Sequence, residues 1–139
     1  MEIFKFKLDP DAKSPTKAHA SDAGFDLYSR EDAVIKARSS HAFDTGVHIE
    51  IPDGYVGFLK SKSGLNVKHS ITSDGVIDAG YTGPIVVKLY NHSDVDYEVK
   101  KGDKVSQIVF LPIPEVVLIE GDFSNDTERG ADGFGSSGR

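Results

Sequence analysis

The last eleven residues of the chain, 129–139, combine a cation, an aromatic ring and a run of glycine and serine. Glycines let a backbone approach a ligand closely and leave its N–H groups free to donate. With the guanidinium of Arg129 and the ring of Phe134, such an arm could wrap a ligand that has a base at one end and a polyphosphate at the other. A Gly/Ser-rich end is also typical of a flexible tail without a function, and these residues alone leave both interpretations open.

The segment Gly75–Gly83 places a carboxylate between an apolar strand end and a glycine-rich turn. At that position Asp78 could orient a water molecule or accept a proton. It could equally cap the turn through its own side chain. Tyr81, which follows in the same turn, could pack against a sugar or belong to a partly buried core.

Two carboxylates, Asp22 and Asp26, lie four residues apart around a glycine. Hard oxygen ligands beside a polyphosphate suggest Mg²⁺, which keeps several waters and takes few ligands from the protein. The alternative is a turn that leads into a strand and carries solvated acids.

Phosphate-binding groups occur in the segment Lys60–Leu65, where two lysines and two serines precede Gly64. Backbone amides, a hydroxyl and an ammonium group are suited to phosphate, although a solvated basic turn would look the same. The spacing of a Walker loop is absent. Further on, Gln107 interrupts an apolar run, so its amide must bind either the backbone or a ligand if it is buried.

The elements that must position these residues are short strands. Alternating or apolar runs indicate them at Glu2–Lys7, Val34–Lys36, Val47–Ile51, Tyr55–Leu59, Ile85–Tyr90, Val95–Val99 and Val105–Leu111. Turn residues separate the runs, and only Gly64–His69 could hold a helical turn or two. Short strands at this spacing predict an all-β sandwich or barrel. We expect residues 1–120 to form that domain and residues 121–139 to be a flexible arm.

Composition narrows the function classes. A chain of 139 residues forms one domain with a real core, and without cysteine it has no disulfide framework. The net charge of −6 argues against a general nucleic-acid binder. No apolar run has the length of a membrane span, and the first residues lack the apolar region of a signal peptide. We therefore expect a cytoplasmic protein with no membrane and no nucleic-acid partner.

Taken in order along the chain, five segments resemble the motifs of the trimeric dUTPase family, the deoxyuridine 5'-triphosphate nucleotidohydrolases. The segments are Ala23–Leu27, Ser63–Leu65, Gly75–Gly83, Gly102–Gln107 and Arg129–Gly138. Each is short, but their order and spacing match over nearly the whole chain. The resemblance implies a jelly-roll β fold with at most one short helix, assembled as a homotrimer whose active sites are shared between subunits. The implied reaction is the Mg²⁺-dependent hydrolysis of dUTP to dUMP and pyrophosphate.

The resemblance also implies roles for individual residues. Asp78 would activate the water that attacks the α-phosphorus, and Tyr81 would pack beneath deoxyribose and exclude a 2′-OH. Backbone groups around Ser73, Gly75 and Val76 would read uracil. Asp26 would hold Mg²⁺ through a bound water. The remaining residues implied to contact substrate are Lys62, Ser63, Gly64 and Gln107 in the body and Arg129, Phe134, Gly135, Ser136 and Ser137 in the tail.

Two positions depart from the usual pattern of the family. Many members have Arg where this chain has Lys62, and lysine keeps the charge but loses the planar two-point grip. The position six before Asp78, often Asn in bacterial members, is Thr72, so the main chain would carry more of the uracil recognition.

Two rival functions share part of this pattern. A dCTP deaminase has the same fold and a similar aspartate motif, but its chemistry needs a glutamate ten residues after that aspartate, where this chain has Lys88. The other rival is a regulatory protein that uses the nucleotide-bound trimer as a switch for an unknown protein partner.

Overall fold

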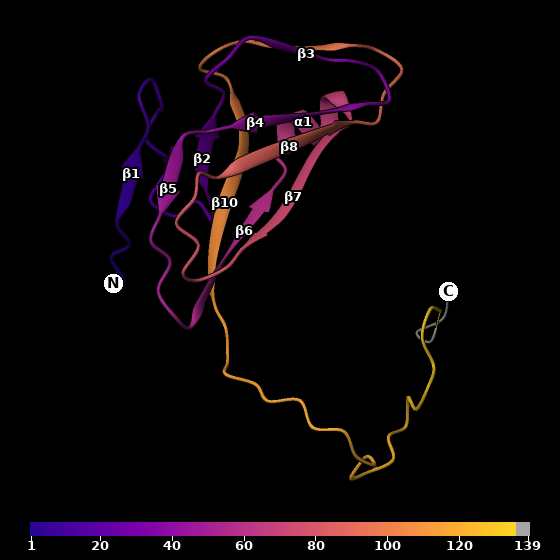
Figure 1. Ribbon diagram of the computed structural model, residues 1–139. Coiled ribbons are helices and arrows are strands. Elements are labelled where there is room, and N and C mark those ends of the chain that lie inside the picture. The colour runs from indigo at the N-terminus through magenta and orange to yellow at the C-terminus, as the bar shows by residue number, and fades with distance from the viewer. Residues whose placement is uncertain (136–139) are drawn as a thin grey trace.

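The computed structural model describes residues 1–135, and over that range it contains ten strands and one helix (Figure 1). Six strands form one antiparallel sheet in the order β2-β10-β6-β7-β8-β4. Their bounds are β2 Phe25–Tyr28, β4 Ser40–Asp44, β6 Tyr55–Lys60, β7 Ile71–Ile77, β8 Val86–Asn91 and β10 Lys104–Pro112. Two smaller antiparallel sheets pair β1 (Phe6–Leu8) with β5 (Val47–Ile49), and β3 (Ala33–Ile35) with β9 (Tyr97–Val99). The prediction of an all-β fold with at most one short helix is confirmed.

Each of the three sheets contributes at least one residue to the core. Leu27 and Ile108 come from the large sheet, Val47 from the β1–β5 pair and Ile35 from the β3–β9 pair, and all four are fully buried in one cluster. Strand β8 alternates exposed and buried residues along its whole length, as a strand with one face on a core does. The three sheets therefore enclose a single core.

Most of the predicted strands are confirmed, with shifted ends. The predicted strand at Glu2–Lys7 was wrong for most of its length. Its partner β5 is short and pairs only with Phe6–Leu8. Strands β2 and β4 were missed, and of β7 only the end before Asp78 was expected. Asp26 interrupts the apolar pattern of β2, and only Phe43 is buried in β4, so neither segment shows a clear period.

The single helix, α1 (Ser63–His69), reverses the chain between β6 and β7. None of its residues is buried, and it ends at Ser70, whose φ of 56° is left-handed. Because it follows β6 directly, its first turn lies at the end of the sheet where Lys60 pairs with Asp74.

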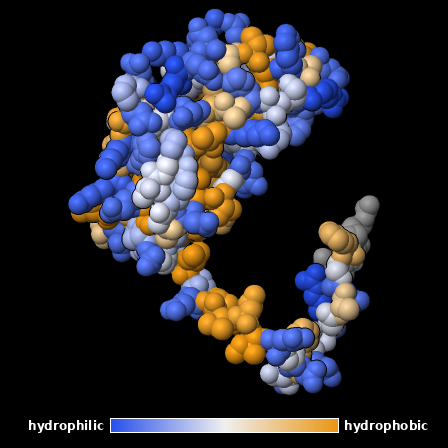
Figure 2. Space-filling view, viewed as in Figure 1, coloured by the Kyte–Doolittle hydropathy of each residue, from blue (hydrophilic) through white to orange (hydrophobic). Residues whose placement is uncertain are grey.

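Beyond β10 the chain leaves the body of the molecule (Figure 1). Every described residue from Leu111 to Gly135 is exposed, and the backbone bond from Ile113 N–H to Gly54 C=O, at 2.8 Å, ties its start to the body. This segment carries large apolar side chains, visible as a hydrophobic stretch in Figure 2, at Ile113, Val116, Val117, Leu118, Ile119 and Phe123. Large exposed apolar patches are typical of interaction surfaces. No helix among residues 1–135 is long and apolar enough to cross a membrane.

We predict that the buried amide of Asn91 stabilises the sheet at the end of β8. Its buried amide donates to the carbonyls of Ile35 (3.0 Å) and Val95 (2.8 Å) and accepts from the N–H and hydroxyl of Ser93. Asn91→Leu would leave these groups without partners and should lower the free energy of unfolding by about 2–4 kcal/mol, measured by urea denaturation. The control is Asn66→Leu on the exposed helix, and equal effects of the two substitutions would contradict the assignment.

Candidate active site

Three of the sequence motifs meet at one end of the large sheet. In the strand register, Gln107 of β10 lies opposite Asp26 of β2 on one side and Lys60 of β6 on the other. The chain leaves β6 there and enters α1 at Ser63. Side chains from three separate parts of the sequence therefore share one surface, which we call the phosphate half-site and define as Asp26, Lys62, Ser63, Gly64, Lys104 and Gln107.

Asp26 is the electrostatic centre of the phosphate half-site. Its carboxylate is buried, and it is bonded by Lys62 Nζ at 2.5 Å on one oxygen and Lys104 Nζ at 3.2 Å on the other. Burial acts to raise the pKa of Asp26, but hydrogen bonds and charge from the two lysines outweigh it and hold the pKa below its ordinary 3.8. The carboxylate is therefore ionised at neutral pH, and both of its oxygens are engaged.

This arrangement bears on the predicted metal contact. Among residues 1–135 no three His, Asp or Glu side chains gather where they could hold a metal ion. Asp22 does not join Asp26, because its carboxylate accepts from the backbone of His19 at 2.9 Å in a local turn. The described residues therefore do not form a set of side chains that would bind a metal ion directly. Contact between Asp26 and Mg²⁺ through water fits this donor set, because Lys62 and Lys104 are partly exposed and free to turn toward a bound polyphosphate.

Two glycines near this surface, Gly24 and Gly64, differ in the space around them. A Cβ on Gly24 would lie 2.5 Å from Gln107 Oε1, so this glycine is required by the packing of the glutamine. A Cβ on Gly64 would meet nothing within 4 Å. Gly64 therefore has no packing reason inside the chain, as expected of a glycine that keeps backbone amides open to a ligand.

Gln107 is half-buried and only partly used by the fold. Its Nε2 donates to Ser61 C=O at 3.1 Å, and within residues 1–135 its Oε1 accepts no hydrogen bond. The amide is thus held by the β6–α1 junction, with polar capacity left for a ligand.

A second group of predicted residues lies on the loop that follows β7. Asp78 is exposed, and its carboxylate makes no hydrogen bond to any described residue, so the turn-capping interpretation finds no support there. Its backbone carbonyl accepts from Tyr81 N–H at 3.3 Å, and Gly80 takes a φ of +85° that favours glycine. The loop thus presents a free carboxylate to solvent.

The ring of Tyr81 is fixed by its own loop. The hydroxyl donates to Pro84 C=O at 2.8 Å, and a Cβ on Gly83 would collide with the ring. Tyr81 stays 43% exposed, so it is a surface ring in this chain and not a core residue.

Strand β7 has an unpaired edge next to this loop. It pairs with β8 only over Ile71–Ser73, whereas its pairing with β6 continues over Asp74–Ile77. The N–H and C=O of Ser73 both bond the hydroxyl of Ser61, on the β6 side. Because successive strand residues point these groups to opposite edges, those of Asp74 and Val76 point to the edge that β8 has left.

Ser73 differs from Gly75 and Val76 in its surroundings. It is buried, and its hydroxyl bonds that of Ser106 at 2.8 Å, in addition to the two backbone contacts with Ser61. Ser73 therefore anchors the start of the free edge from inside the sheet. We define the loop half-site as Asp74–Ile77, Asp78 and Tyr81.

Within one chain, Asp78 and its loop lie at the opposite end of the sheet from the phosphate half-site, and the free edge of β7 runs between the two ends. Since β7 is antiparallel to β6, Ile77 lies beside Gly57 while Asp74 lies beside Lys60. From Gly57 to Lys62 the extended chain covers roughly 17 Å at about 3.3 Å per residue. Asp78 thus cannot reach a phosphate held at Ser63 and Gln107 of the same subunit.

The tail residues are also separate from the body. Arg129 Nε donates to Asp132 C=O at 2.7 Å in a local turn, and Phe134 and Gly135 are exposed. The predicted contacts of Ser136 and Ser137 lie outside the described residues. Within one chain the structure thus brings together the phosphate half-site and, elsewhere, the loop half-site, but not the tail.

The sequence interpretation did not identify two residues that contact the candidate site, Lys104 and His48. Lys104 was inside a recognised motif, but its pairing with Asp26 depends on the register of β10 with β2. His48 contacts the loop half-site through Thr82, which is distant from it in sequence. The sequence around either residue did not indicate its contact, because each contact joins segments that are far apart in the chain.

Comparison with known proteins places the chain in a family. The family model described as dUTPase matches residues 10–138. A relative from Schizosaccharomyces pombe, named as a probable deoxyuridine 5'-triphosphate nucleotidohydrolase, is 43% identical and covers 99% of both chains. The dUTPase of Staphylococcus bacteriophage 80alpha with dUpNHpp superposes with a TM-score of 0.90 at 32% identity over the full length of both chains.

A structure of a dUTPase variant from phage phi11 of S. aureus, described as coordinating a structural Mg(II) ion, superposes with a TM-score of 0.78. It is 29% identical and covers 86% of this chain and 98% of the phage chain.

The lysine pair around Asp26 leads to a pH prediction. Because the pKa of Asp26 is lowered in the folded chain, its contribution to stability is present above 3.8 and is lost as the pH falls through the lowered value. Asp26→Asn should lower the free energy of unfolding by about 1–3 kcal/mol at pH 7 and by less at pH 3, measured with urea. Asp22→Asn is the control, and an Asp26→Asn deficit that is the same at both pH values would contradict the ion-pair account.

Proposed function

Because the chain belongs to the dUTPase family, we propose that its two half-sites meet between subunits of a homotrimer to form the active site. The chain hydrolyses dUTP to dUMP and pyrophosphate, as the deoxyuridine 5'-triphosphate nucleotidohydrolases that it resembles over nearly its full length do. The reaction removes dUTP as a source of uracil in DNA. The phosphate half-site, the loop half-site and the tail each perform one part of it.

The observation that carries the assignment is the separation of Asp78 from the phosphate half-site within one chain. A triphosphate bound at Ser63 and Gln107 of one subunit needs a carboxylate from elsewhere, because Asp78 of that subunit lies at the other end of its sheet. A neighbouring subunit supplies it when a threefold axis brings the loop of one chain to the helix of the next. The exposed apolar segment Ile113–Phe123 supports the assembly, since a neighbouring subunit would cover it.

Asp78 activates the hydrolytic water in this site. Its carboxylate is exposed and has no partner among the described residues, so it is free to hold a water molecule and accept its proton. The water oxygen bonds to the α-phosphorus as the bond from that phosphorus to the bridging oxygen breaks, and pyrophosphate leaves.

The free edge of β7 reads the base. Backbone N–H and C=O groups of Asp74 and Val76 offer uracil a donor and acceptors in the manner of a pairing strand, with Gly75 allowing close approach and Ser73 anchoring the edge. Tyr81 packs beneath the deoxyribose. Its ring cannot retreat, because Gly83 and Pro84 hold it, so a 2′-OH would meet it.

The phosphate half-site neutralises the triphosphate. Ser63 and Gly64 bind phosphate oxygens through exposed amides and a hydroxyl, and Gln107 adds a contact. Lys62 turns from Asp26 toward the phosphates, and Asp26 would then be the residue that holds Mg²⁺ through a water. When bound, Mg²⁺ would neutralise charge that develops on the phosphate oxygens.

The tail of a third subunit closes the site. Phe134 stacks on uracil, and Arg129 with the amides and hydroxyls of Gly135, Ser136 and Ser137 covers the phosphates. Closure excludes bulk water and completes the set of donors around the phosphates.

The deaminase alternative does not fit the structure. The position that would need a glutamate is Lys88, an exposed residue of β8 whose ammonium lies over the ring of Tyr90. No observation in residues 1–135 favours the regulatory protein over the enzyme.

The substrate prediction uses Asp78→Asn. The purified chain with Mg²⁺ should release pyrophosphate from dUTP and react poorly with UTP and dTTP. Asn keeps the shape of the side chain but cannot take the proton, so kcat should fall by about 10²–10⁴-fold while a non-hydrolysable dUTP analogue still binds. Exposed Asp94→Asn, which removes a surface pair with Arg38, is the control. Comparable kcat/KM for UTP and dUTP would refute the sugar filter.

Sharing of the site is tested by mixing two inactive variants. Asp78→Asn lacks the base, and truncation after Phe123 lacks the tail but almost no core, so each should be inactive alone. Refolded together in equal amounts, random trimers should recover about one quarter of full activity, because each site takes the two parts from different subunits and each part is intact half the time. Absence of any recovery, with mixed trimers verified by mass, would exclude sharing of these two parts between subunits. Asp78→Asn combined with the truncation in one chain is the control partner.

A further inference from the structure

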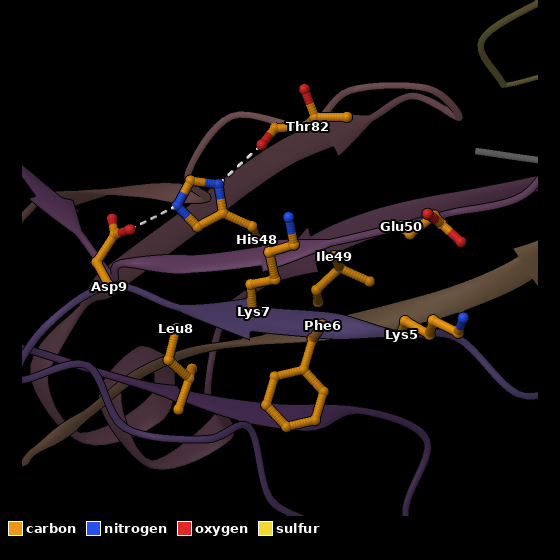
Figure 3. A pocket seen from close by; sticks show the side chains of 9 residues that line it. All are labelled: Lys5, Phe6, Lys7, Leu8, Asp9, His48, Ile49, Glu50 and Thr82. Atoms are coloured by element: carbon orange, nitrogen blue, oxygen red, sulfur yellow. Dashed lines mark hydrogen bonds and ion pairs between the residues drawn. The ribbon is translucent and has the colours of Figure 1, made fainter.

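His48 of β5 ties the first residues of the chain to the loop half-site. Its Nε2 lies 2.9 Å from Asp9 Oδ1, and its Nδ1 lies 2.8 Å from the backbone oxygen of Thr82 (Figure 3). Thr82 directly follows Tyr81 in the loop that also carries Asp78. One imidazole therefore bridges a distant carboxylate and the segment to which we assign catalysis and sugar recognition.

Both partners of His48 can only accept hydrogen bonds. A carbonyl oxygen and a carboxylate oxygen are both acceptors, so both ring nitrogens must donate. A neutral imidazole donates from one nitrogen alone, whereas the imidazolium donates from both. The contact with Thr82 and the contact with Asp9 exist together only when His48 is protonated.

The charges around His48 favour that form. The hydrogen bond to Thr82 is the largest cause that raises the pKa of His48 above its ordinary 6.5, followed by the hydrogen bond to Asp9, and Asp44 adds a smaller attraction. His48 is one quarter exposed on a groove of about 500 Å³ that Lys5, Lys7 and Glu50 also line, so protons can reach it from solvent. The lysines oppose protonation, and Glu50 and the two aspartates favour it.

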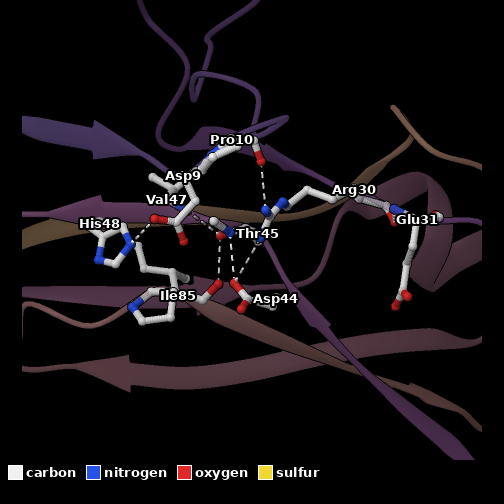
Figure 4. Close-up of polar contacts among 12 residues, drawn as sticks. Asp9, Pro10, Arg30, Glu31, Asp44, Thr45, Val47, His48 and Ile85 are labelled. Carbon is white, nitrogen blue, oxygen red and sulfur yellow. Dashed lines mark hydrogen bonds and ion pairs between the residues drawn. The ribbon is translucent and has the colours of Figure 1, made fainter.

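Asp9 is itself held firmly. Its N–H donates to Gly46 C=O at 2.8 Å, and the next residue, Pro10, accepts from Arg30 Nη2 at 2.7 Å (Figure 4). Arg30 also lies 3.7 Å from Asp44, so it ties this turn to β4. His48 thus connects the loop to a rigid support.

The rest of the loop has few such ties. Over residues 79–83 the backbone bond that reaches outside the loop joins Gly80 N–H to Ile51 C=O, and it is long at 3.4 Å. The Tyr81 bonds to Asp78 and Pro84 lie within the loop and would move with it. Ala79 packs against the core at the start of the loop, and His48 supplies the side-chain hydrogen bond that ties Thr82 to the body.

We propose that protonated His48 is a positioning residue that holds the Asp78–Pro84 loop in its catalytic geometry, a role that rests on the function proposed above. As the pH rises through the titration of His48, the bond to Asp9 or the bond to Thr82 is lost. The loop then loosens, and Asp78 and Tyr81 lose their alignment with the bound nucleotide. Activity therefore falls on the alkaline side for a reason independent of Asp78 itself.

NMR of the ligand-free chain tests the coupling without any turnover. The His48 ring should titrate with a midpoint above 6.5, and the backbone amides of Gly80 and Tyr81 should shift with the same midpoint. In His48→Gln these amide shifts should no longer titrate, because glutamine keeps a donor for Thr82 but has no proton to lose. The control is His41→Gln. The Nε2 of His41 lies 2.8 Å from Glu31 Oε1, and this pair is not part of the loop. Loop amides that ignore the His48 titration would overturn the proposal.

Kinetics give a second, separate measurement. For the native chain kcat/KM for dUTP should drop by about tenfold across the His48 titration. His48→Gln should retain most of the activity and lose this alkaline decline, and His48→Ala should be about tenfold less active at all pH values. Equal pH profiles for His48→Gln and the native chain would refute the role of His48. If the native chain failed to hydrolyse dUTP, the proposed function would fail, while the NMR coupling would still stand or fall on its own.

Discussion

The antiparallel pairing of β6 with β7 is the constraint on which the active site depends. It carries the chain from the phosphate half-site, through α1, back along the sheet to the loop of Asp78 at the far end. A rigid sheet cannot fold these ends together, so the active site proposed here needs groups from more than one subunit. In the proposed trimer, sharing of active sites between subunits is a consequence of strand direction, and the exposed apolar segment after β10 is the surface that a neighbouring subunit would cover.

The two half-sites are built on different physical principles. In the phosphate half-site, buried Asp26 is held ionised by two lysines, and breaking such a pair is costly unless another anion takes its place. A triphosphate is such an anion, so binding exchanges one set of charge pairs for another. In the loop half-site, Asp78 is exposed and has no partner among the described residues, which keeps it available as a base.

Specificity arises from rigidity, whereas closure needs mobility. The free edge of β7 belongs to a six-stranded sheet, and Tyr81 is held within its loop by Gly83 and Pro84, so in the proposed site base and sugar would meet groups fixed in place by their neighbours. The tail contributes little to the core and is suited to open and close. In its proposed role, His48 would limit the mobility of the Asp78–Pro84 loop, which has few backbone hydrogen bonds of its own to the body.

The sequence alone determined the all-β class, the single helix and the identity of the five motifs, since period, turn residues and motif order are local properties. It could not show that Lys104 pairs with Asp26, that Ser73 is buried, or that β8 leaves an edge of β7 free. It also could not reveal the contact of His48 with Thr82. These features depend on strand register and on which edges meet, and register is decided by packing between segments far apart in the chain. Only the tertiary structure therefore showed that the motifs form two separate half-sites.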